Sequence, residues 1–163
     1  MAREIYLDYA ATTPVDPRVV EVMTECLGLD SDSANPSSTH APGRRAWARV
    51  QTARAQIAER IGVSPDTVCF TSGATESDNM ALVGAMRANE HRGRHMITSA
   101  LEHKAILDTA RALEVQGVEV TYIDHDSDGV IDPDRLAEAL RDDTVLVSIM
   151  HVNNETGVLQ DIE

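Results

Sequence analysis

The chain has 163 residues, of which 42% are hydrophobic and 3% aromatic, and its net charge is −13. This length is sufficient for one globular domain with a core made mainly of aliphatic side chains. The negative charge, together with the lack of any lysine or arginine cluster, argues against direct nucleic-acid binding and against an anionic membrane surface. There is no secretory signal and no run of about 18 apolar residues, so we expect a cytoplasmic protein whose partners are small molecules or proteins.

The first part of the chain predicts a long loop followed by a helix. Proline, serine and asparagine crowd together in residues 29–43, and loops of this length are usually functional or disordered. Residues 44–62 then carry apolar side chains at helical spacing and end in Gly62, a common helix stop.

The rest of the chain alternates between short apolar strands and amphipathic helices. Such alternation predicts an α/β fold with a mostly parallel sheet and helices on both faces. The expected strands are residues 67–72, 95–100, 118–123 and 144–150, and the expected helices are residues 75–91, 102–117 and 132–141.

The cysteines and the acidic residues do not predict a metal site. Cys26 and Cys69 lack metal-type spacing, and we expect both to be inert core residues, Cys69 within the strand 67–72. Residues 124–135 resemble a calcium loop, but the last position holds Arg135 where a glutamate is required, and a strand precedes it instead of a helix. An acidic turn before a helix is the better interpretation.

The motif "SGATESDN", residues 72–79, follows the first expected strand. Gly73 permits close backbone approach, the helix beginning near Ala74 offers free N–H groups, and Thr75 adds a hydroxyl, which is the form of a phosphate-binding cradle. A plain glycine turn with a helix cap is the alternative for so short a motif.

Two further polar groups follow expected strands. His103, after the strand 95–100, would suit ring stacking or proton transfer, although a helix-capping or solvent-facing histidine is the simpler alternative. Residues 151–157 follow the strand 144–150 and contain Asn154, whose amide would suit a ligand hydroxyl or carboxylate. A turn stabilised by asparagine side chains is the alternative there.

In an open α/β sheet, ligands bind at the carboxyl ends of the strands. A phosphate cradle, a candidate stacking histidine and a candidate amide at three strand ends together describe a site for a phosphorylated aromatic cofactor. Pyridoxal 5'-phosphate fits this description.

The motifs "IYLDYAATTPVDPRV", "NPSSTH", "VCFTSGATESDN", "TSALEHKAILDT" and "SIMHVNNETGVLQDI" resemble, in the same order, the hallmarks of cysteine desulfurases. The resemblance implies a fold type I pyridoxal-phosphate enzyme that is usually a homodimer. It also implies that residues 17–163 are an incomplete large domain and that residues 1–16 are an N-terminal segment of the small domain.

The resemblance implies roles for individual residues. Ala74 and Thr75 would contact the cofactor phosphate, and His103 would stack on the ring and handle protons. Asn154 would lie near the cofactor hydroxyl and the substrate. Asn35 and His40 would line the entrance, which would give the loop 29–43 a function.

The family's Schiff-base lysine, the aspartate that pairs with the pyridinium nitrogen and the sulfur-receiving cysteine belong to later segments. Lys104, the single lysine of the chain, lies in the ring-stacking motif, so we interpret it as a solvated or lightly paired helix residue. The resemblance therefore implies a C-terminal half that supplies the missing groups.

The expected activity of the completed enzyme is conversion of L-cysteine to L-alanine and a protein-bound persulfide. The sulfur would pass to an acceptor scaffold protein for iron–sulfur cluster assembly or tRNA thiolation, by a homodimer or a hetero-oligomer, while the isolated chain would be inactive. Two alternatives remain open: a non-catalytic binding or dimerisation subunit, and a related lyase acting on selenocysteine or another amino acid.

Overall fold

A computed structural model describes residues 4–28, 31 and 33–162. The chain divides into two compact units, with the boundary between Phe70 and Thr71. Each unit is described by itself below.

The first unit is helical and has little core. Its elements are α1 (Pro17–Leu27), α2 (Ala41–Ile61) and a short 3-10 helix η1 (Pro65–Thr67). Asp16 begins α1 by accepting the N–H of Arg18, and Gly62 ends α2 in the left-handed conformation, at φ 71°. The described residues of α1 include none that is buried, and those of α2 bury only small side chains.

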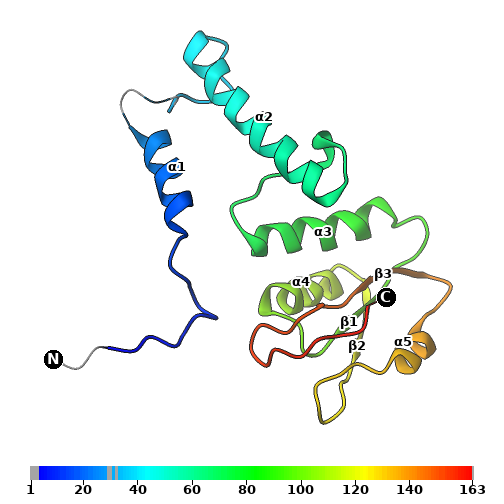
Figure 1. The fold of residues 1–163 in the computed structure, drawn as a ribbon. Helices are drawn as coiled ribbons and strands as arrows, with labels where there is room; N and C mark the ends of the chain where they lie inside the picture. Colours follow the sequence, from blue (N-terminus) through cyan, green and yellow to red (C-terminus); the bar gives the residue numbers. More distant parts are fainter. Residues whose placement is uncertain (1–3, 29–30, 32, 163) are drawn as a thin grey trace. The chain divides into compact units, whose positions relative to one another are not determined.

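The second unit contains a parallel sheet with intervening helices (Figure 1). Its elements are α3 (Ala74–Ala88), β1 (His95–Ser99), α4 (Lys104–Val115), β2 (Glu119–Ile123), α5 (Pro133–Ala139) and β3 (Thr144–Ser148). The strand order is β2-β1-β3, and both pairings are parallel. The predicted α/β architecture is confirmed, and three of the four predicted strands lie where the sequence pattern placed them.

Successive strand residues point to opposite sides of the sheet, so the apolar strands place side chains on both faces. Helices cover both of these faces. Met96 packs with residues of α3 and α4, and Ile97 packs in a second cluster that includes Ala139 of α5. The α3 and α4 side is the larger core, and its buried members are Leu82, Met86, Met96, Ile106, Ala110 and Leu113.

His95 ties the three strands together at the amino edge of the sheet. Its side chain is fully buried, and its ring nitrogens form hydrogen bonds to Thr144 Oγ1 at 2.7 Å and Thr121 Oγ1 at 2.8 Å. Burial lowers the pKa of His95, and the nearby positive charge of Arg141 lowers it further. The buried imidazole therefore acts as a neutral link between neighbouring strands.

The prediction of a strand at residues 67–72 is wrong. Strand propensity depends on a neighbouring strand to pair with, and this segment pairs with none of the strands in the described residues. Instead, the carbonyl of Val68 accepts a hydrogen bond from Arg54, whose guanidinium lies 4.9 Å from the ring centroid of Phe70. This segment is thus held against α2 by the side chain of Arg54.

The expectation that Cys26 and Cys69 are core residues is also wrong. Cys69 is exposed because its segment is not part of a sheet. Cys26 is half-buried, and its Sγ accepts a hydrogen bond of 3.1 Å from Arg49.

The loop predicted at residues 29–43 is shorter, because α2 already begins at Ala41. Residues 29, 30 and 32 of that loop lie outside the described residues. Gly43 is buried against the turn before it, where an added Cβ would collide with the backbone of Ser38 and Asn35. The assignment of residues 1–16 to the small domain stays a prediction.

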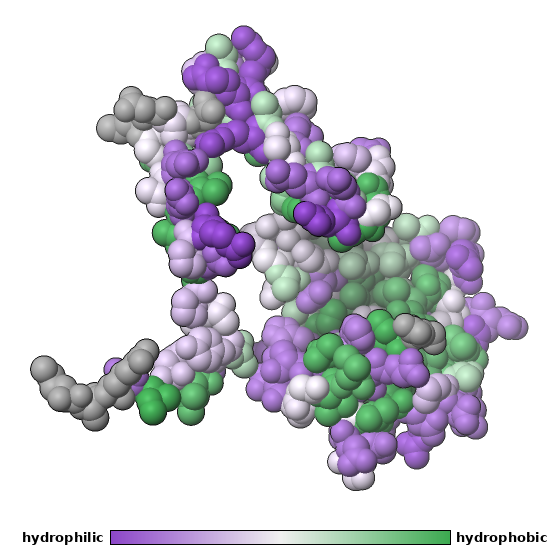
Figure 2. Space-filling view, in the orientation of Figure 1, coloured by the Kyte–Doolittle hydropathy of each residue, from purple (hydrophilic) through white to green (hydrophobic). Residues whose placement is uncertain are grey.

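Hydrophobic surface gathers over part of the second unit on the face shown in Figure 2. Exposed apolar residues of its β3 strand and C-terminal segment include Val147, Val152, Leu159 and Ile162. Among the helices of the described residues, none has the length and apolar character needed to cross a membrane.

Candidate cofactor site

The N-terminus of α3 provides a set of exposed hydrogen-bond donors. Gly73 adopts an extended conformation as the N-cap, and Ala74 and Thr75 in the first turn are exposed. The first N–H groups of a helix have no partner within the helix and carry the positive end of its dipole. No side-chain cap occupies them here.

Glu76 stabilises the approach to this helix without filling its end. Its carboxylate accepts the backbone N–H of Ser72 at 2.6 Å and the Ser72 hydroxyl at 2.7 Å, and both bonds lower the pKa of Glu76. The turn before α3 is therefore held by a local pair, and the Thr75 hydroxyl remains available.

His103 is the N-cap of α4 and ends the short turn that follows β1. Its Nδ1 accepts the N–H of Ala105 at 3.1 Å, and the residue is exposed. The capping alternative raised by the sequence is thus realised, and it leaves the rest of the ring accessible. Because Nδ1 is the acceptor, the proton of the neutral ring lies on Nε2.

The segment after β3 forms a turn that is organised by Asn153 and leaves Asn154 exposed. Asn153 is buried, and its Oδ1 accepts the N–H groups of Glu155 and Thr156 at 2.9 and 3.0 Å. Within the part of the chain that the structure describes, the Asn154 amide donates to the neighbouring Glu155 carboxylate, at 3.1 Å, and to no other group. The asparagine-stabilised turn and an available amide therefore occur together, on adjacent residues.

Two hydrogen bonds join the His103 segment to the Asn154 segment. The Glu102 carboxylate accepts the N–H of Met150 at 2.5 Å, and the Asn153 amide donates to the carbonyl of Leu101 at 3.0 Å. These contacts follow from the sheet order, because β1 and β3 are neighbours and their carboxyl ends meet at one edge. The structure thus brings together two of the predicted groups.

α3 packs against α4, the helix that begins at this edge with His103 as its N-cap. Asp78 acts electrostatically on Glu102, and it raises the pKa of that carboxyl beyond the effect of burial. The phosphate cradle is therefore related to the other two groups through helix packing, since no strand precedes α3. This differs from the expected arrangement of three strand ends.

The two residues expected at the entrance belong to the first unit. Asn35 accepts the N–H of Ser37 at 2.8 Å, and His40 caps α2 by accepting the N–H of Gly43 at 3.2 Å. Their role beside the cofactor stays a prediction.

Comparison with known proteins identifies the family of the chain. The pattern of the family Aminotransferase class-V matches residues 5–163. The chain belongs to this family.

Named relatives of the chain are cysteine desulfurases. The chain is 57% identical to the cysteine desulfurase IscS of Enterobacter sp. (strain 638) over 99% of its own length and 40% of the relative. It is also similar in structure to SspA in complex with cysteine, with a TM-score of 0.88 and 40% identity, over 97% of this chain and 45% of that one. A third similar protein is the apo cysteine desulfurase from Thermococcus onnurineus NA1, with a TM-score of 0.83 and 28% identity over 97% of this chain and 39% of that one.

The chain thus spans less than half the length of the relatives that it matches. Its α/β fold is that of the cysteine desulfurase structures.

The exposed groups of this class-V aminotransferase chain fit pyridoxal phosphate chemically. A phosphate dianion requires several N–H donors and benefits from a helix N-terminus, which α3 offers without a capping side chain. An aromatic ring requires an exposed planar group, which His103 offers, and a ring hydroxyl requires a donor such as the Asn154 amide. The donor set therefore matches the three parts of the cofactor.

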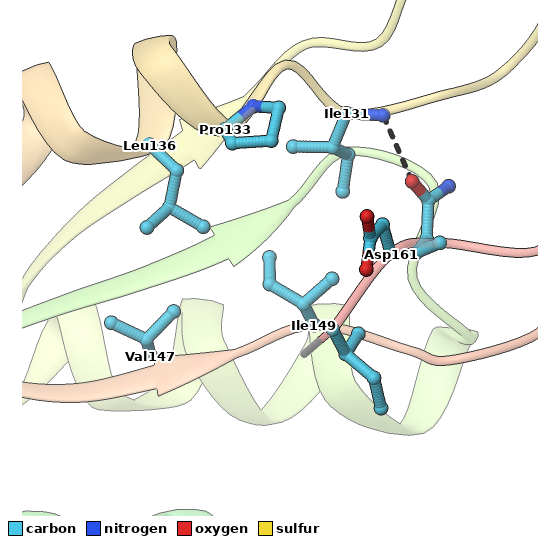
Figure 3. A pocket seen from close by; sticks show the side chains of 8 residues that line it. Ile131, Pro133, Leu136, Val147, Ile149 and Asp161 are labelled. Atoms are coloured by element: carbon cyan, nitrogen blue, oxygen red, sulfur yellow. Dashed lines mark hydrogen bonds between the residues drawn. The ribbon is translucent and has the colours of Figure 1, made fainter.

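An apolar pocket lies elsewhere in the second unit, on the α5 side of the sheet (Figure 3). Gln160 is a buried residue of its lining and accepts the N–H of Ile131 at 2.9 Å. The residues that line it are Ile131, Pro133, Leu136, Val147, Ile149, Gln160, Asp161 and Ile162. This pocket contains none of the predicted cofactor contacts, and its apolar walls do not suit a phosphate.

The calcium-like segment forms an acidic turn, as the sequence predicted. The Asp126 carboxylate accepts the N–H groups of Asp128 and Val130, both at 2.9 Å, and α5 follows at Pro133. The Asp126 carboxylate thus accepts hydrogen bonds from the backbone of the same turn.

Lys104 is a surface residue of α4. Its side chain is 84% exposed, and its Nζ lies 3.9 Å from the carboxylate of Asp108 one turn later. The prediction of a solvated, lightly paired lysine is confirmed.

Proposed function

We propose that this chain is the N-terminal part of a pyridoxal-phosphate-dependent cysteine desulfurase. The completed enzyme breaks the C–S bond of L-cysteine, releases L-alanine and leaves the sulfur as a persulfide on a cysteine of the C-terminal part. The observation that carries the proposal is the 57% identity to a cysteine desulfurase over nearly the whole chain. The exposed cradle, histidine and amide support it, because each offers the chemistry that the cofactor requires.

The first turn of α3 binds the phosphate in this proposal. The N–H groups of Ala74 and Thr75 and the Thr75 hydroxyl donate to its oxygens, and the helix dipole favours its charge. Hydrogen bonds to a charged group contribute about 1.5–3 kcal/mol each, so this turn would supply much of the cofactor affinity.

His103 orients the ring and handles a proton. The capping bond from Ala105 fixes the imidazole plane and keeps Nδ1 as an acceptor. Nε2 is therefore the atom that holds the exchangeable proton near the substrate. When bound, pyridoxal phosphate supplies the electron sink that stabilises negative charge on the substrate carbon.

Asn154 contributes an amide donor to the cofactor hydroxyl and the substrate. Asn35 and His40 line the entrance. The partners of the enzyme are a C-terminal half with the Schiff-base lysine and persulfide cysteine, a second copy in a dimer, and a sulfur-acceptor scaffold protein. The pathway served is iron–sulfur cluster assembly or tRNA thiolation in the cytoplasm.

Reconstitution tests this proposal. The chain is purified alone and together with the region of a homologous cysteine desulfurase that it does not cover, which we call the reconstituted assembly. With pyridoxal phosphate and a thiol reductant, L-cysteine should yield equal amounts of sulfide and alanine in the assembly and none with the chain alone.

His103→Ala in the reconstituted assembly should lower the rate by roughly 100-fold or more, as expected for loss of a proton-transfer group. Steady turnover by the chain alone, or a folded assembly that binds the cofactor and does not act on cysteine, would contradict the proposal.

A further inference from the structure

Glu102 is a buried acidic residue between segments that carry exposed candidate ligands. It is 8% exposed, whereas the adjacent His103 is exposed. Its carboxylate accepts the Met150 N–H at 2.5 Å across 48 positions of sequence. The carboxyl group thus lies inside the edge of the sheet, beneath the segments that face solvent.

Each of the two segments, the one after β1 and the one after β3, contributes a side chain that bonds to the backbone of the other. Glu102, in the turn between β1 and α4, accepts from the backbone after β3, and Asn153, after β3, donates to the Leu101 carbonyl in that same turn. Each bond uses a buried side chain on one segment and a backbone group on the other. Two such reciprocal bonds restrict the segments more than a single contact, because sliding of either segment breaks both.

Glu102 is a costly side chain to bury at this position. Burial penalises its charge, and the nearby carboxylate of Asp78 opposes ionisation as well. The N–H groups of Met150 and His103, together with the electrostatic effect of His103, lower the pKa and offset part of this cost. A neutral glutamine oxygen could accept the same N–H, so the link to Met150 requires the acceptor oxygen and not the charge.

We propose that Glu102 is a positioning residue that holds His103 and Asn154 at a fixed spacing by anchoring the segment after β3 to the start of α4. The proposal rests on the proposed function, since His103 and Asn154 are taken as cofactor contacts. Glu102 itself touches no reacting group: it acts through the backbone of Met150 and through its own neighbour in sequence. The carboxylate and Asn153 together form what we call the carboxyl-edge clamp.

The first test uses the 163-residue chain without cofactor, by amide NMR and hydrogen exchange. In Glu102→Ala, the Met150 amide should shift and lose protection, and the shift changes should extend to Asn154 and His103. Glu102→Gln retains an acceptor and should leave Asn154 and His103 near their wild-type positions. Gln160→Ala is the matched control, because Gln160 is a buried polar residue that ties the same C-terminal segment to Gly129 and Ile131 instead.

The positions of the shifts decide between positioning and general support. Changes at Asn154 and His103 in Glu102→Ala but not in Gln160→Ala support the proposal. Equal changes in both variants, or no change at His103 and Asn154 in Glu102→Ala, overturn it. Should Glu102→Ala fail to fold, Glu102→Asp decides instead, since it keeps the charge but is one methylene too short to reach Met150.

The second test uses the reconstituted assembly with pyridoxal phosphate. Loss of the clamp should change the visible circular dichroism of the bound cofactor and lower kcat by roughly 10- to 100-fold with a smaller change in KM, as expected for a misplacement near 1 Å. Glu102→Gln should largely restore both. Unchanged cofactor dichroism and kcat in a folded Glu102→Ala assembly would overturn the positioning role.

The two tests separate this inference from the proposed function. If the wild-type assembly bound no pyridoxal phosphate, the proposed function would fail, while the NMR shifts would still report whether Glu102 positions the two segments. If the assembly were active and the shifts did not occur, only the positioning role would fail.

Discussion

The two edges of the sheet in the second unit both contain a buried polar residue of the β1 region, but they differ in how that residue is satisfied. At the amino edge, both ring nitrogens of His95 bond to threonine hydroxyls on the neighbouring strands. At the carboxyl edge, Glu102 holds a carboxylate against backbone N–H groups, with an acidic neighbour in Asp78.

The exposed groups around the two edges also differ in whether their hydrogen-bonding and charged partners are already present. Near His95, Arg141 pairs with Glu119 at 2.7 Å and Asp143 at 2.9 Å, so the exposed charges are already matched. Near Glu102, the exposed groups are His103 and Asn154, which bond only within their own segments. The amino edge is thus built for stability, and the carboxyl edge retains free hydrogen-bonding capacity, as expected for the ligand-binding edge of an α/β sheet.

The largest expected effect is loss of stability at the amino edge. His95→Ala removes both links and leaves a cavity between three strands, so the free energy of unfolding should fall by about 3 kcal/mol. Denaturant unfolding of the chain measures this change. In the reconstituted assembly at a temperature where the variant is folded, cofactor affinity should stay within about twofold, well below the tenfold that corresponds to 1.4 kcal/mol. A selective loss of cofactor affinity in His95→Ala would contradict the division between the edges.

The next largest effect is a loss of cofactor affinity without a loss of folding stability. Thr75→Ala removes an exposed hydroxyl from the first turn of α3, and it should weaken pyridoxal phosphate binding by about 1.5–3 kcal/mol, or roughly 10- to 100-fold. Titration of the reconstituted assembly measures the affinity, and the unfolding free energy of the chain should be nearly unchanged. Thr75→Ser keeps the hydroxyl and should bind like the wild type. Equal affinities for all three proteins would refute the cradle.

The amino-acid sequence was sufficient to predict much of this fold, because local patterns determine it. Strands at 95–100, 118–123 and 144–150 alternate with helical segments, and each lies where the pattern indicated. The segment 67–72 has the same apolar character, yet its conformation depends on whether another strand pairs with it, which a local pattern cannot reveal. Cys69 was misplaced for the same reason.

The exposed residues of the candidate site can be selected from the sequence, and the buried residues that join its segments cannot. Thr75, His103 and Asn154 are polar residues directly after apolar segments, a signal that sequence reasoning can use. Glu102 and Asn153 stand beside them and received no role, because their partners lie 48 and 52 positions away and become neighbours only through the strand order. A charged residue between a buried strand and a helix was the one signal for Glu102.

A smaller effect should appear in the pH dependence of stability. Burial raises the pKa of Glu102, the N–H groups of Met150 and His103 oppose this, and Asp78 adds to the rise. The folded state therefore holds this proton more tightly than the unfolded state, whose glutamates titrate near the ordinary value of about 4.3. The stability from this group is fully present below that value and is lost as the pH rises through the folded pKa.

Glu102→Gln removes this titration and nothing else of comparable size. The difference in unfolding free energy, wild type minus variant, should therefore fall between acidic and neutral pH. Taking the difference cancels the opposite slope from carboxylates with lowered pKa, such as Asp143. A difference that rises with pH would show that the folded state favours the ionised carboxylate of Glu102.

The smallest expected effect belongs to Lys104, which lies beside His103 but outside the carboxyl-edge clamp. Its ammonium is 84% exposed and 3.9 Å from Asp108, and exposed pairs of this kind contribute about 0.3–0.5 kcal/mol at most. Lys104→Arg keeps the charge and the pair but removes the only primary amine among the side chains of the chain. Visible absorbance of cofactor bound to the reconstituted assembly should therefore persist in the variant, with kcat within about twofold, whereas the same spectrum in His103→Ala should change. Loss of the absorbance band in Lys104→Arg, with folding intact by circular dichroism, would show that the cofactor is bound through this lysine.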